Sequence, residues 1–420
     1  MPDNVAYRND ALHCEDVPLA ALAAEHGTPL YVYSRRSMLD RLASLAAAFE
    51  ALDPLLAYSV KANGNLSILR LLADAGAGAD IVSGGELHRA ERAGVPADRI
   101  VFSGVGKTRD ELEAALDAGI LCLNVESEGE LRLLSQVARE AGRDAPFALR
   151  INPDIESPTP HPYTRTGHRA TKFGIEHERA MELYRLALEL GGLEPVGIDV
   201  HIGSQITDPE PYRRSLARLL ELVDALEGHG IALRHVDLGG GFGVAHEGQE
   251  APDAMAFAAV IMPLMEGRGL RLVLEPGRYV VGHAGVLLTR VLYVKRTGGK
   301  TFVITDAGMN DLLRPSHYAS FHPVTPVERV PGRPSGAVDV VGPICESGGF
   351  LALDRELPLP EPGALLAIQV AGAYGFTMAS TYNARPRPAE VLVDGDRARL
   401  IRRRETYEDL VRGEEELLHA

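Results

Sequence analysis

Short apolar runs alternate with amphipathic stretches through the first two thirds of the chain. Each run is bounded by turn residues, which is typical of a buried strand, and the stretches between runs have the apolar spacing of helices. This alternation favours a parallel (β/α)₈ barrel, although an open doubly wound sheet has the same rhythm. The predicted strands are Leu55–Val60, Ala79–Val82, Ile100–Phe102, Leu121–Val125, Phe147–Ile151, Val196–Val200, His235–Leu238 and Leu270–Leu274. The predicted helices include Leu66–Ala75, Gly85–Ala93, Arg109–Ala118, Glu128–Ala141, Glu178–Glu189 and Glu210–Glu227.

The pattern changes after Glu275. Apolar runs there are joined by Pro- and Gly-rich turns with few helices between them, which predicts a second, mainly β domain of sandwich or barrel type. Tyr31-Val32-Tyr33 also has a strand pattern but precedes the barrel, so we expect it to join the β domain. The prediction is a barrel over residues 36–283 and a discontinuous β domain over 1–35 and 284–420. The expected strands after Glu275 are Val286–Lys295, Thr301–Thr305, Ala337–Val341, Leu365–Val370 and Glu390–Val393.

Composition narrows the possible functions. The 420 residues are 45% apolar, which is enough for two cores. The net charge of -15 argues against nucleic acid as a partner. The arginine run at 402–404 stands among acidic residues and is interpreted as a solvated face. Cys14, Cys122 and Cys345 have neither metal-ligand nor disulfide spacing. With no apolar signal core and no membrane-length stretch, the sequence predicts a cytoplasmic protein without a metal or a membrane contact.

Polar residues gather at the carboxyl ends of the predicted strands, where barrel enzymes carry their active sites. Lys61 ends the first run, and a lysine there is costly to bury unless it is paired or used covalently. Partial desolvation lowers the pKa of an amine and makes it a better nucleophile toward a carbonyl. The alternative is a strand-end lysine whose ammonium reaches solvent. The other strand ends carry Asp80, His201 with Ser204, Gly239–Gly243, and Glu275-Pro276-Gly277-Arg278.

Together these groups predict a pyridoxal phosphate (PLP) site. Lys61 would hold the cofactor as an imine, and Glu275 would pair with the pyridine nitrogen so that the ring accepts electrons. His201 would stack on the ring. Gly239–Gly243 and Ser204 would hold the phosphate, which barrels commonly bind after the seventh strand. Each group also has a simpler interpretation: a satisfied strand-end histidine, a capping or ion-paired glutamate, and a tight glycine turn.

Longer motifs show a resemblance to a known family. From about Pro29 to Leu410 the chain resembles the diaminopimelate decarboxylases, group IV PLP enzymes with an alanine-racemase-like barrel fold. The motifs are long and occur in the family's order. They distinguish the diaminopimelate branch less sharply from the ornithine and arginine decarboxylases. They are YSVKAN at 58–63, VSGGEL at 82–87, HPYTRTG at 161–167, KFGI at 172–175, HIGSQI at 201–206, GGGFG at 239–243, EPGRY at 275–279, DAGMNDLLRPSHY at 306–318, GPICESGGFLA at 342–352, AGAYGF at 371–376, YNARPRPAEVL at 382–392 and RRRETYEDL at 402–410. Two places depart from the usual pattern: Gly349, where members usually have an acid, and the loop Ala319-Ser320-Phe321-His322.

The resemblance implies roles for individual residues. A guanidinium binds a carboxylate through two hydrogen bonds, so two arginines suit a substrate with a second acid group. Cys345 and Glu346 are implied to reach the site from a second subunit, which makes a homodimer the catalytic unit. The implied cofactor residues are Lys61, Asp80, His201, Ser204, Gly240, Gly241, Glu275, Gly277, Arg278 and Tyr374. The implied substrate residues are Arg278, Arg314, Tyr318, Glu346 and Tyr374.

The implied reaction is decarboxylation of meso-2,6-diaminopimelate to L-lysine and CO₂, the last step of lysine biosynthesis. Cys345 and Lys61 are the candidate proton donors. A sister decarboxylase that acts on another basic or carrier-bound amino acid stays open. Arg278 and Arg314 argue against a substrate such as ornithine, which has no second carboxylate for them to bind. A non-enzymatic PLP-binding protein also stays open, although such proteins are usually the barrel alone. An amino-acid racemase needs a second base on the opposite ring face, and the sequence identifies none.

Overall fold

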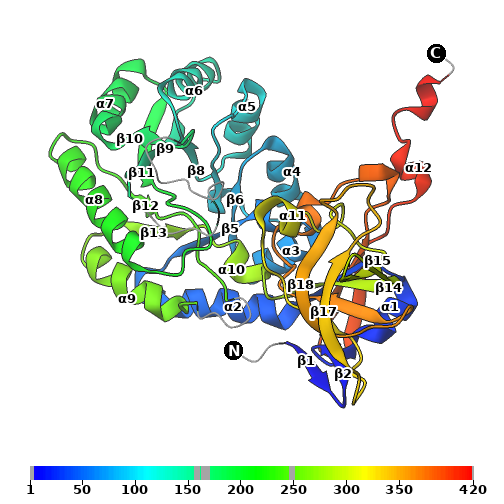
Figure 1. Cartoon of the computed structure of the whole chain (residues 1–420). Coiled ribbons are helices and arrows are strands. Elements are labelled where there is room, and N and C mark those ends of the chain that lie inside the picture. Colours follow the sequence, from blue (N-terminus) through cyan, green and yellow to red (C-terminus); the bar gives the residue numbers. More distant parts are fainter. Residues whose placement is uncertain (1–3, 156–160, 162–170, 246–250, 419–420) are drawn as a thin grey trace. The chain divides into compact units, whose positions relative to one another are not determined.

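The computed structural model describes residues 4–155, 161, 171–245 and 251–418. These residues form two compact units (Figure 1). One unit, here called the β unit, holds the chain up to Leu39 and from Val280 onward. The other, the barrel unit, holds Asp40–Ala245 and the segment that ends at Tyr279.

The barrel unit is built on a closed ring of parallel strands. The hydrogen-bonded order is β9-β11-β12-β13-β5-β6-β7-β8, and β8 pairs again with β9, which closes the ring. A short strand, β10 (Ile175–Glu176), adds to β9. The closing pair confirms the (β/α)₈ prediction and excludes the open sheet. The ring strands are β5 (Leu55–Ser59), β6 (Gly78–Ile81), β7 (Ile100–Phe102), β8 (Cys122–Val125), β9 (Ala145–Asn152), β11 (Leu193–Asp199), β12 (His235–Asp237) and β13 (Arg271–Leu274).

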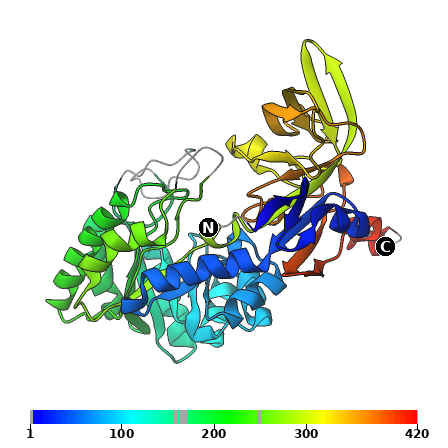
Figure 2. The same cartoon turned by 90° about the horizontal axis from the view of Figure 1, so that it is seen from below.

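Helices lie on the outside of this ring (Figure 2). Several begin at a serine or threonine whose side chain accepts a backbone N–H of the first turn, as Ser83, Thr108 and Ser127 do. No helix in the described part of the chain is both long and apolar enough to cross a membrane. The helices from α2 to α10 are α2 (Arg35–Ala48), α3 (Leu66–Asp74), α4 (Gly84–Ala93), α5 (Arg109–Ala118), α6 (Glu128–Glu140), α7 (Ala180–Leu190), α8 (Glu210–Glu227), α9 (Ala254–Met265) and α10 (Arg278–Val281).

The β unit is organised around β14 (Gly285–Thr297). This strand pairs with β4 (Leu30–Ser34), β15 (Lys300–Thr305) and β19 (Leu365–Ile368). Because β4 also pairs in parallel with β20 (Ala389–Asp394), the prediction that Tyr31–Tyr33 joins the β domain is confirmed. The other elements are β1 (Val5–Arg8), β2 (Ala11–Cys14), β3 (Val17–Pro18), α1 (Leu19–His26), α11 (Arg314–Tyr318), β16 (Val324–Pro326), β17 (Ser335–Val341), β18 (Phe350–Pro358), β21 (Arg397–Arg402) and α12 (Tyr407–Leu410).

Each unit has its own apolar core. In the barrel unit, small and branched side chains from several ring strands meet, among them Ala57, Val101 and Val273. In the β unit, Val32 from β4 and Val286 from β14 pack in one cluster with residues of the N-terminal strands. The N-terminal segment is therefore an integral part of the β unit.

The arginine run at 402–404 is not the solvated face that was predicted. Arg402 pairs with the fully buried Glu390 and lies 4.6 Å from the ring centre of Phe376. Arg404 is half-buried and donates to a main-chain carbonyl at 2.7 Å. Arg403 is the exposed member of the run. The acceptors of Arg402 and Arg404 come from distant parts of the chain, so the local charge pattern could not reveal them.

The predicted strand Leu365–Val370 ends two residues early, at Ile368. Val370 has a φ of +55°, which lies in the left-handed region and cannot continue an extended strand. A β-branched residue is unfavourable there, so sequence alone gave no reason to expect the turn at this position.

Candidate active site

Lys61 lies just past β5, where the strand ends in a short helical turn. Its Nζ donates to Asp80 Oδ2 on β6 at 2.8 Å, and 33% of its side chain is exposed. The same carboxylate oxygen accepts from Ser59 Oγ at 2.9 Å. Asp80 Oδ1 is buried and has no hydrogen-bond partner among the described residues. A paired but accessible amine beside an unsatisfied buried oxygen fits a site that a polar ligand completes.

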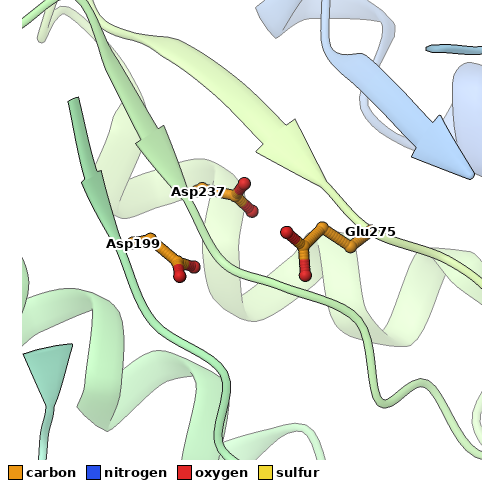
Figure 3. A group of neighbouring side chains, drawn as sticks. All are labelled: Asp199, Asp237 and Glu275. Carbon is orange, nitrogen blue, oxygen red and sulfur yellow. The ribbon is translucent and has the colours of Figure 1, made fainter. Parts of the chain in front are cut away.

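Glu275 follows β13, and its carboxyl group lies inside the barrel. Ser103 Oγ donates to its Oε1 at 3.1 Å, and Asn124 Nδ2 donates to that serine at 3.1 Å. Asp199 on β11 and Asp237 on β12 bring carboxyl oxygens within 4.8 Å of Glu275 and of each other. Figure 3 shows the three carboxyl groups turned toward one another from neighbouring strands. We call Asp199, Asp237 and Glu275 the carboxyl cluster.

The carboxyl cluster cannot be fully ionised at neutral pH. Burial raises the pKa of Asp199 and Glu275 well above the ordinary range, and the other acids reinforce the effect. Burial also raises the pKa of Asp237 to about 7, although the Gly239 N–H that it accepts at 2.9 Å opposes the shift. Acids this close share protons. Shared protons explain how the three carboxyl groups can lie so close together, so we assign no metal to the cluster.

Arg150 supplies positive charge beside the carboxyl cluster. Its Nη1 pairs with the buried Glu126 at 2.8 Å, and its Nε lies 3.9 Å from Asp199 Oδ2. A buried cation and anion in mutual contact keep each other charged inside the barrel.

The sequence prediction missed this interior set, because it considered one motif at the end of each of five strands. A signal was present: polar letters stand within or directly after otherwise apolar strand runs. The missed residues are Ser59, Ser103, Asn124, Glu126, Arg150, Asp199 and Asp237.

His201 is held as a neutral imidazole. Its Nδ1 lies 3.0 Å from the backbone N–H of Gly240, and since an N–H can only donate, Nδ1 must accept and the ring proton sits on Nε2. Desolvation by the surrounding protein lowers the pKa of His201 well below its usual range, and the charges of Arg150 and Lys61 act in the same direction. A neutral, flat ring is suited to stacking on an aromatic cofactor.

The glycines at 239–243 are required by the packing of the loops themselves. A Cβ on Gly240 would lie 2.1 Å from the carbonyl oxygen of Glu275, and one on Gly241 would lie 2.3 Å from that of Gly203. Gly241 also has a φ of +96°. Glycine at these positions is therefore explained without an anion, and the N–H of Gly240 already has His201 as acceptor.

A polar pair nearby has the chemistry of an anion site. Arg278 Nη2 lies 3.4 Å from Ser204 Oγ; Arg278 begins α10 after β13, and Ser204 lies in the loop after β11. A guanidinium and a hydroxyl at the mouth of a barrel are donors suited to a phosphate. With Lys61, Glu275 and His201, the donor set at this end of the barrel fits PLP.

The β unit gathers a second set of predicted residues. Arg314 is 6% exposed, and its guanidinium carbon lies 5.8 Å and 6.0 Å from the ring centres of Tyr318 and Tyr374. Cys345 and Glu346 lie on a separate exposed loop, where the Cys345 N–H donates to Asn383 Oδ1 at 2.8 Å.

The other predicted cofactor residues, including Asp80 and Gly277, are in the barrel unit, and Gly277 lies against Ser59 and Ala62. The motif at 161–167 lies outside the described residues apart from His161.

Replacing Asp237 by asparagine is expected to change how the stability of the cofactor-free protein depends on pH. Between the ordinary value of 3.8 and about 7, the folded protein holds the Asp237 proton that the unfolded chain has lost. Stability therefore falls as pH rises through this window, by up to about 1.4 kcal/mol per pH unit. The substituted asparagine has no proton to lose, yet its amide oxygen can still accept the Gly239 N–H. Urea unfolding at pH 5, 6, 7 and 8 should show that the free energy of unfolding of the variant increases relative to that of the wild type as pH rises.

A matched control for this experiment is Asp253→Asn. Asp253 is exposed and also accepts one backbone N–H, that of Ala256 at 2.9 Å. Its variant should follow the wild-type pH profile. Parallel profiles for Asp237→Asn and the wild type would show that Asp237 is ionised in the folded protein and would contradict the assignment.

Comparison with known proteins agrees with this site. Residues 35–282 match the family model of the pyridoxal binding domain of pyridoxal-dependent decarboxylases. A diaminopimelate decarboxylase of Neisseria meningitidis is 50% identical over 97% of this chain and 98% of its own length. The structure of diaminopimelate decarboxylase from Helicobacter pylori complexed with L-lysine matches with a TM-score of 0.92 and 43% identity, over 95% of this chain and 100% of that one. A lysine/ornithine decarboxylase from Vibrio vulnificus complexed with cadaverine shares the fold at a TM-score of 0.80 and 22% identity, over 90% and 97% of the two chains. The chain belongs to the diaminopimelate decarboxylase family of PLP-dependent decarboxylases.

Proposed function

We propose that this protein decarboxylates meso-2,6-diaminopimelate to L-lysine and CO₂, the last step of lysine biosynthesis, with PLP bound at Lys61. One observation carries the proposal. The Lys61 amine is accessible and held by Asp80 at one end of the barrel whose interior contains the carboxyl cluster, with Glu275 as a member. The close relatives that bear this name, and the L-lysine in the Helicobacter pylori structure, support the same substrate and product.

Several barrel residues are suited to hold the cofactor. Lys61 would carry it covalently, and Asp80 would keep that amine in place. Glu275 would face the pyridine nitrogen, and His201 would lie on the ring face. Ser204, Arg278 and Tyr374 would hold the phosphate, and Gly240, Gly241 and Gly277 would allow the adjoining loops to pass close to it. Bound PLP supplies an electron sink for the bond that breaks.

The substrate residues would bind the end of the substrate that does not react. Arg314 and Arg278 can each bind a carboxylate through paired N–H groups, and Tyr318 and Tyr374 offer hydroxyls. Glu346 would receive the distal ammonium. Holding both charged groups of the L-centre fixes the D-centre at the reacting position, so the geometry of binding decides which carboxylate leaves. Cys345 or Lys61 would return the proton to the reacting carbon.

We also propose that the working unit is a homodimer in which Cys345 and Glu346 complete the site of the partner. Both residues lie on an exposed loop, where a second subunit could contact them. The hydrogen bond from the Cys345 N–H to Asn383 fixes the backbone of that loop. The three cysteines, Cys14, Cys122 and Cys345, are free thiols, which supports a reducing compartment such as the cytoplasm.

Mixed dimers test the shared site. When Lys61→Ala and Glu346→Ala chains are produced together, random pairing makes half of the dimers mixed, and each mixed dimer has one intact site. The isolated mixed dimers are expected to have about half of the wild-type activity, and the unseparated mixture about a quarter, although each variant alone is nearly inactive. The measurement is CO₂ release by mixed dimers isolated with two different affinity tags. Activity no higher than that of the separate variants would mean that Glu346 serves the site of its own chain.

A substrate panel tests the proposed reaction itself. Purified protein with PLP is incubated with meso-diaminopimelate, L-ornithine, L-lysine or L-arginine, and CO₂ release is measured. Release from meso-diaminopimelate alone is expected, because the other three have no second carboxylate for Arg278 and Arg314. Release only from another amino acid would make the protein a sister decarboxylase. No release from protein that retains the cofactor absorbance would favour a carrier-bound substrate or a non-enzymatic PLP protein.

A further inference from the structure

His322 is a fully buried histidine that contacts the guanidinium of Arg314. Its Nδ1 lies 3.0 Å from the carbonyl oxygen of Gln369, and its Nε2 lies 3.4 Å from Arg314 Nε. A carbonyl can only accept a hydrogen bond, and an arginine can only donate one. His322 must therefore be neutral, with its proton on Nδ1 and its lone pair on Nε2 directed at Arg314.

The same loop provides a second contact to Arg314. Ser320 Oγ lies 3.1 Å from Arg314 Nη2. Contacts at both Nε and Nη2 fix the plane of the guanidinium as well as its position, because the group is rigid and planar. Ser320 and His322 both belong to the loop that follows Tyr318.

The other end of this arrangement is anchored in the sheet of the β unit. The Gln369 N–H donates to Pro323 at 2.9 Å, and its side chain donates to Thr325 Oγ1 of β16 at 3.0 Å. The next residue, Val370, has the unfavourable φ of +55°. Strain of this kind persists only where the surroundings impose it. Here it lies in the turn that aims the Gln369 carbonyl at His322.

We propose that His322 and Ser320 are positioning residues for Arg314, and that they determine the preference for a ligand with a distal carboxylate over a diamine. The inference rests on the proposed function, in which Arg314 binds that carboxylate. A long arginine side chain loses much rotational freedom when it binds a ligand, and a guanidinium held in advance avoids most of that loss. A diamine has no carboxylate to bind and gains nothing from the arrangement.

Binding of two probes to the holoenzyme tests this proposal. L-Lysine keeps the distal carboxylate, and cadaverine is the corresponding diamine without it. In the His322→Leu variant, the Kd for L-lysine from calorimetry should rise about tenfold, while the Kd for cadaverine changes less than about twofold. The KM for meso-diaminopimelate should rise by a similar factor with kcat nearly unchanged, because the lost contact is the same in the ground state and the transition state.

Three further variants separate positioning from general damage. His322→Gln keeps an acceptor for Arg314 and should recover most of the L-lysine affinity. Ser320→Ala leaves the buried histidine untouched and should weaken L-lysine binding about threefold. His229→Leu is the matched control, because the ring of His229 contacts a carbonyl at 2.8 Å but is exposed and lies in the barrel unit. It should bind both probes as the wild type does.

Two results would overturn the proposal. Equal weakening of L-lysine and cadaverine would mean that His322 supports the site as a whole, and unchanged binding of both would mean that it does not act on Arg314. If His322→Leu does not fold, unchanged L-lysine binding by Ser320→Ala would overturn the proposal. Wild-type protein that fails to decarboxylate meso-diaminopimelate would instead contradict the proposed function, so the two failures are distinguishable.

Discussion

Replacing Lys61 by alanine is expected to reduce CO₂ release from meso-diaminopimelate by about 10⁴-fold or more. The amine lies 2.8 Å from Asp80 and is one-third exposed, so it is both oriented and accessible. Alanine removes the group that would hold the cofactor covalently and one of the two candidate proton donors. The variant should also lose the absorbance band of lysine-bound cofactor, which is a measurement independent of turnover.

Two control variants distinguish chemistry from folding. Lys61→Arg keeps a positive charge for the buried Asp80 but cannot bond covalently to PLP, and it should be as inactive as Lys61→Ala with wild-type stability. Lys295→Ala removes an exposed lysine of β14 and should be fully active. Activity of Lys61→Ala above about a tenth of the wild type would contradict the assignment of Lys61 as the lysine that binds PLP.

Replacing Glu275 by glutamine should lower kcat by about 10²- to 10³-fold and change KM little. Glutamine has nearly the same shape and can still accept from Ser103, which donates to Glu275 Oε1 at 3.1 Å. Glutamine cannot take up the negative charge that Glu275 would carry when it pairs with a protonated pyridine nitrogen, and that ring proton is what makes the ring a strong electron acceptor. The loss should therefore fall on the chemical step, and binding of PLP through Lys61 and the phosphate site should persist.

The controls for Glu275 address its environment. Ser103→Ala removes the neighbouring donor but keeps the carboxylate, and its kcat should fall less than about tenfold. Glu266→Gln, on the exposed end of α9, should behave as the wild type. A Glu275→Gln enzyme with nearly normal kcat would mean that another group holds the ring proton, and the Asp237→Asn variant would then be examined for the same defect.

The barrel and its active end could be predicted from the sequence, because buried strands have apolar runs and turn residues mark their ends. Lys61, Asp80, His201, Ser204 and Arg278 therefore lie where the strand-end rule places them. Their roles stay predictions, as do the domain boundaries at residues 35–36 and 283–284.

The barrel interior and the support of Arg314 could not be predicted in the same way. Asp199 and Asp237 each stand as one polar letter inside an apolar run, and only the closed ring reveals that they meet Glu275. His322 contacts Arg314 directly, and its ring is oriented by the Gln369 carbonyl, which precedes the left-handed Val370; no local pattern predicts that conformation. Arg402 likewise has its acceptor, Glu390, on another strand.

Product formation in D₂O tests both the reaction and the end of the substrate at which it occurs. Holoenzyme is given meso-diaminopimelate, and lysine is analysed by chiral chromatography and mass spectrometry while CO₂ is counted. We expect one CO₂ per lysine, L-lysine alone, and a single deuterium at the carbon that lost its carboxylate. Racemic or D-lysine, or deuterium at the carbon that keeps its carboxylate, would show that the distal L-centre is not the end held by the enzyme and would contradict the proposed function.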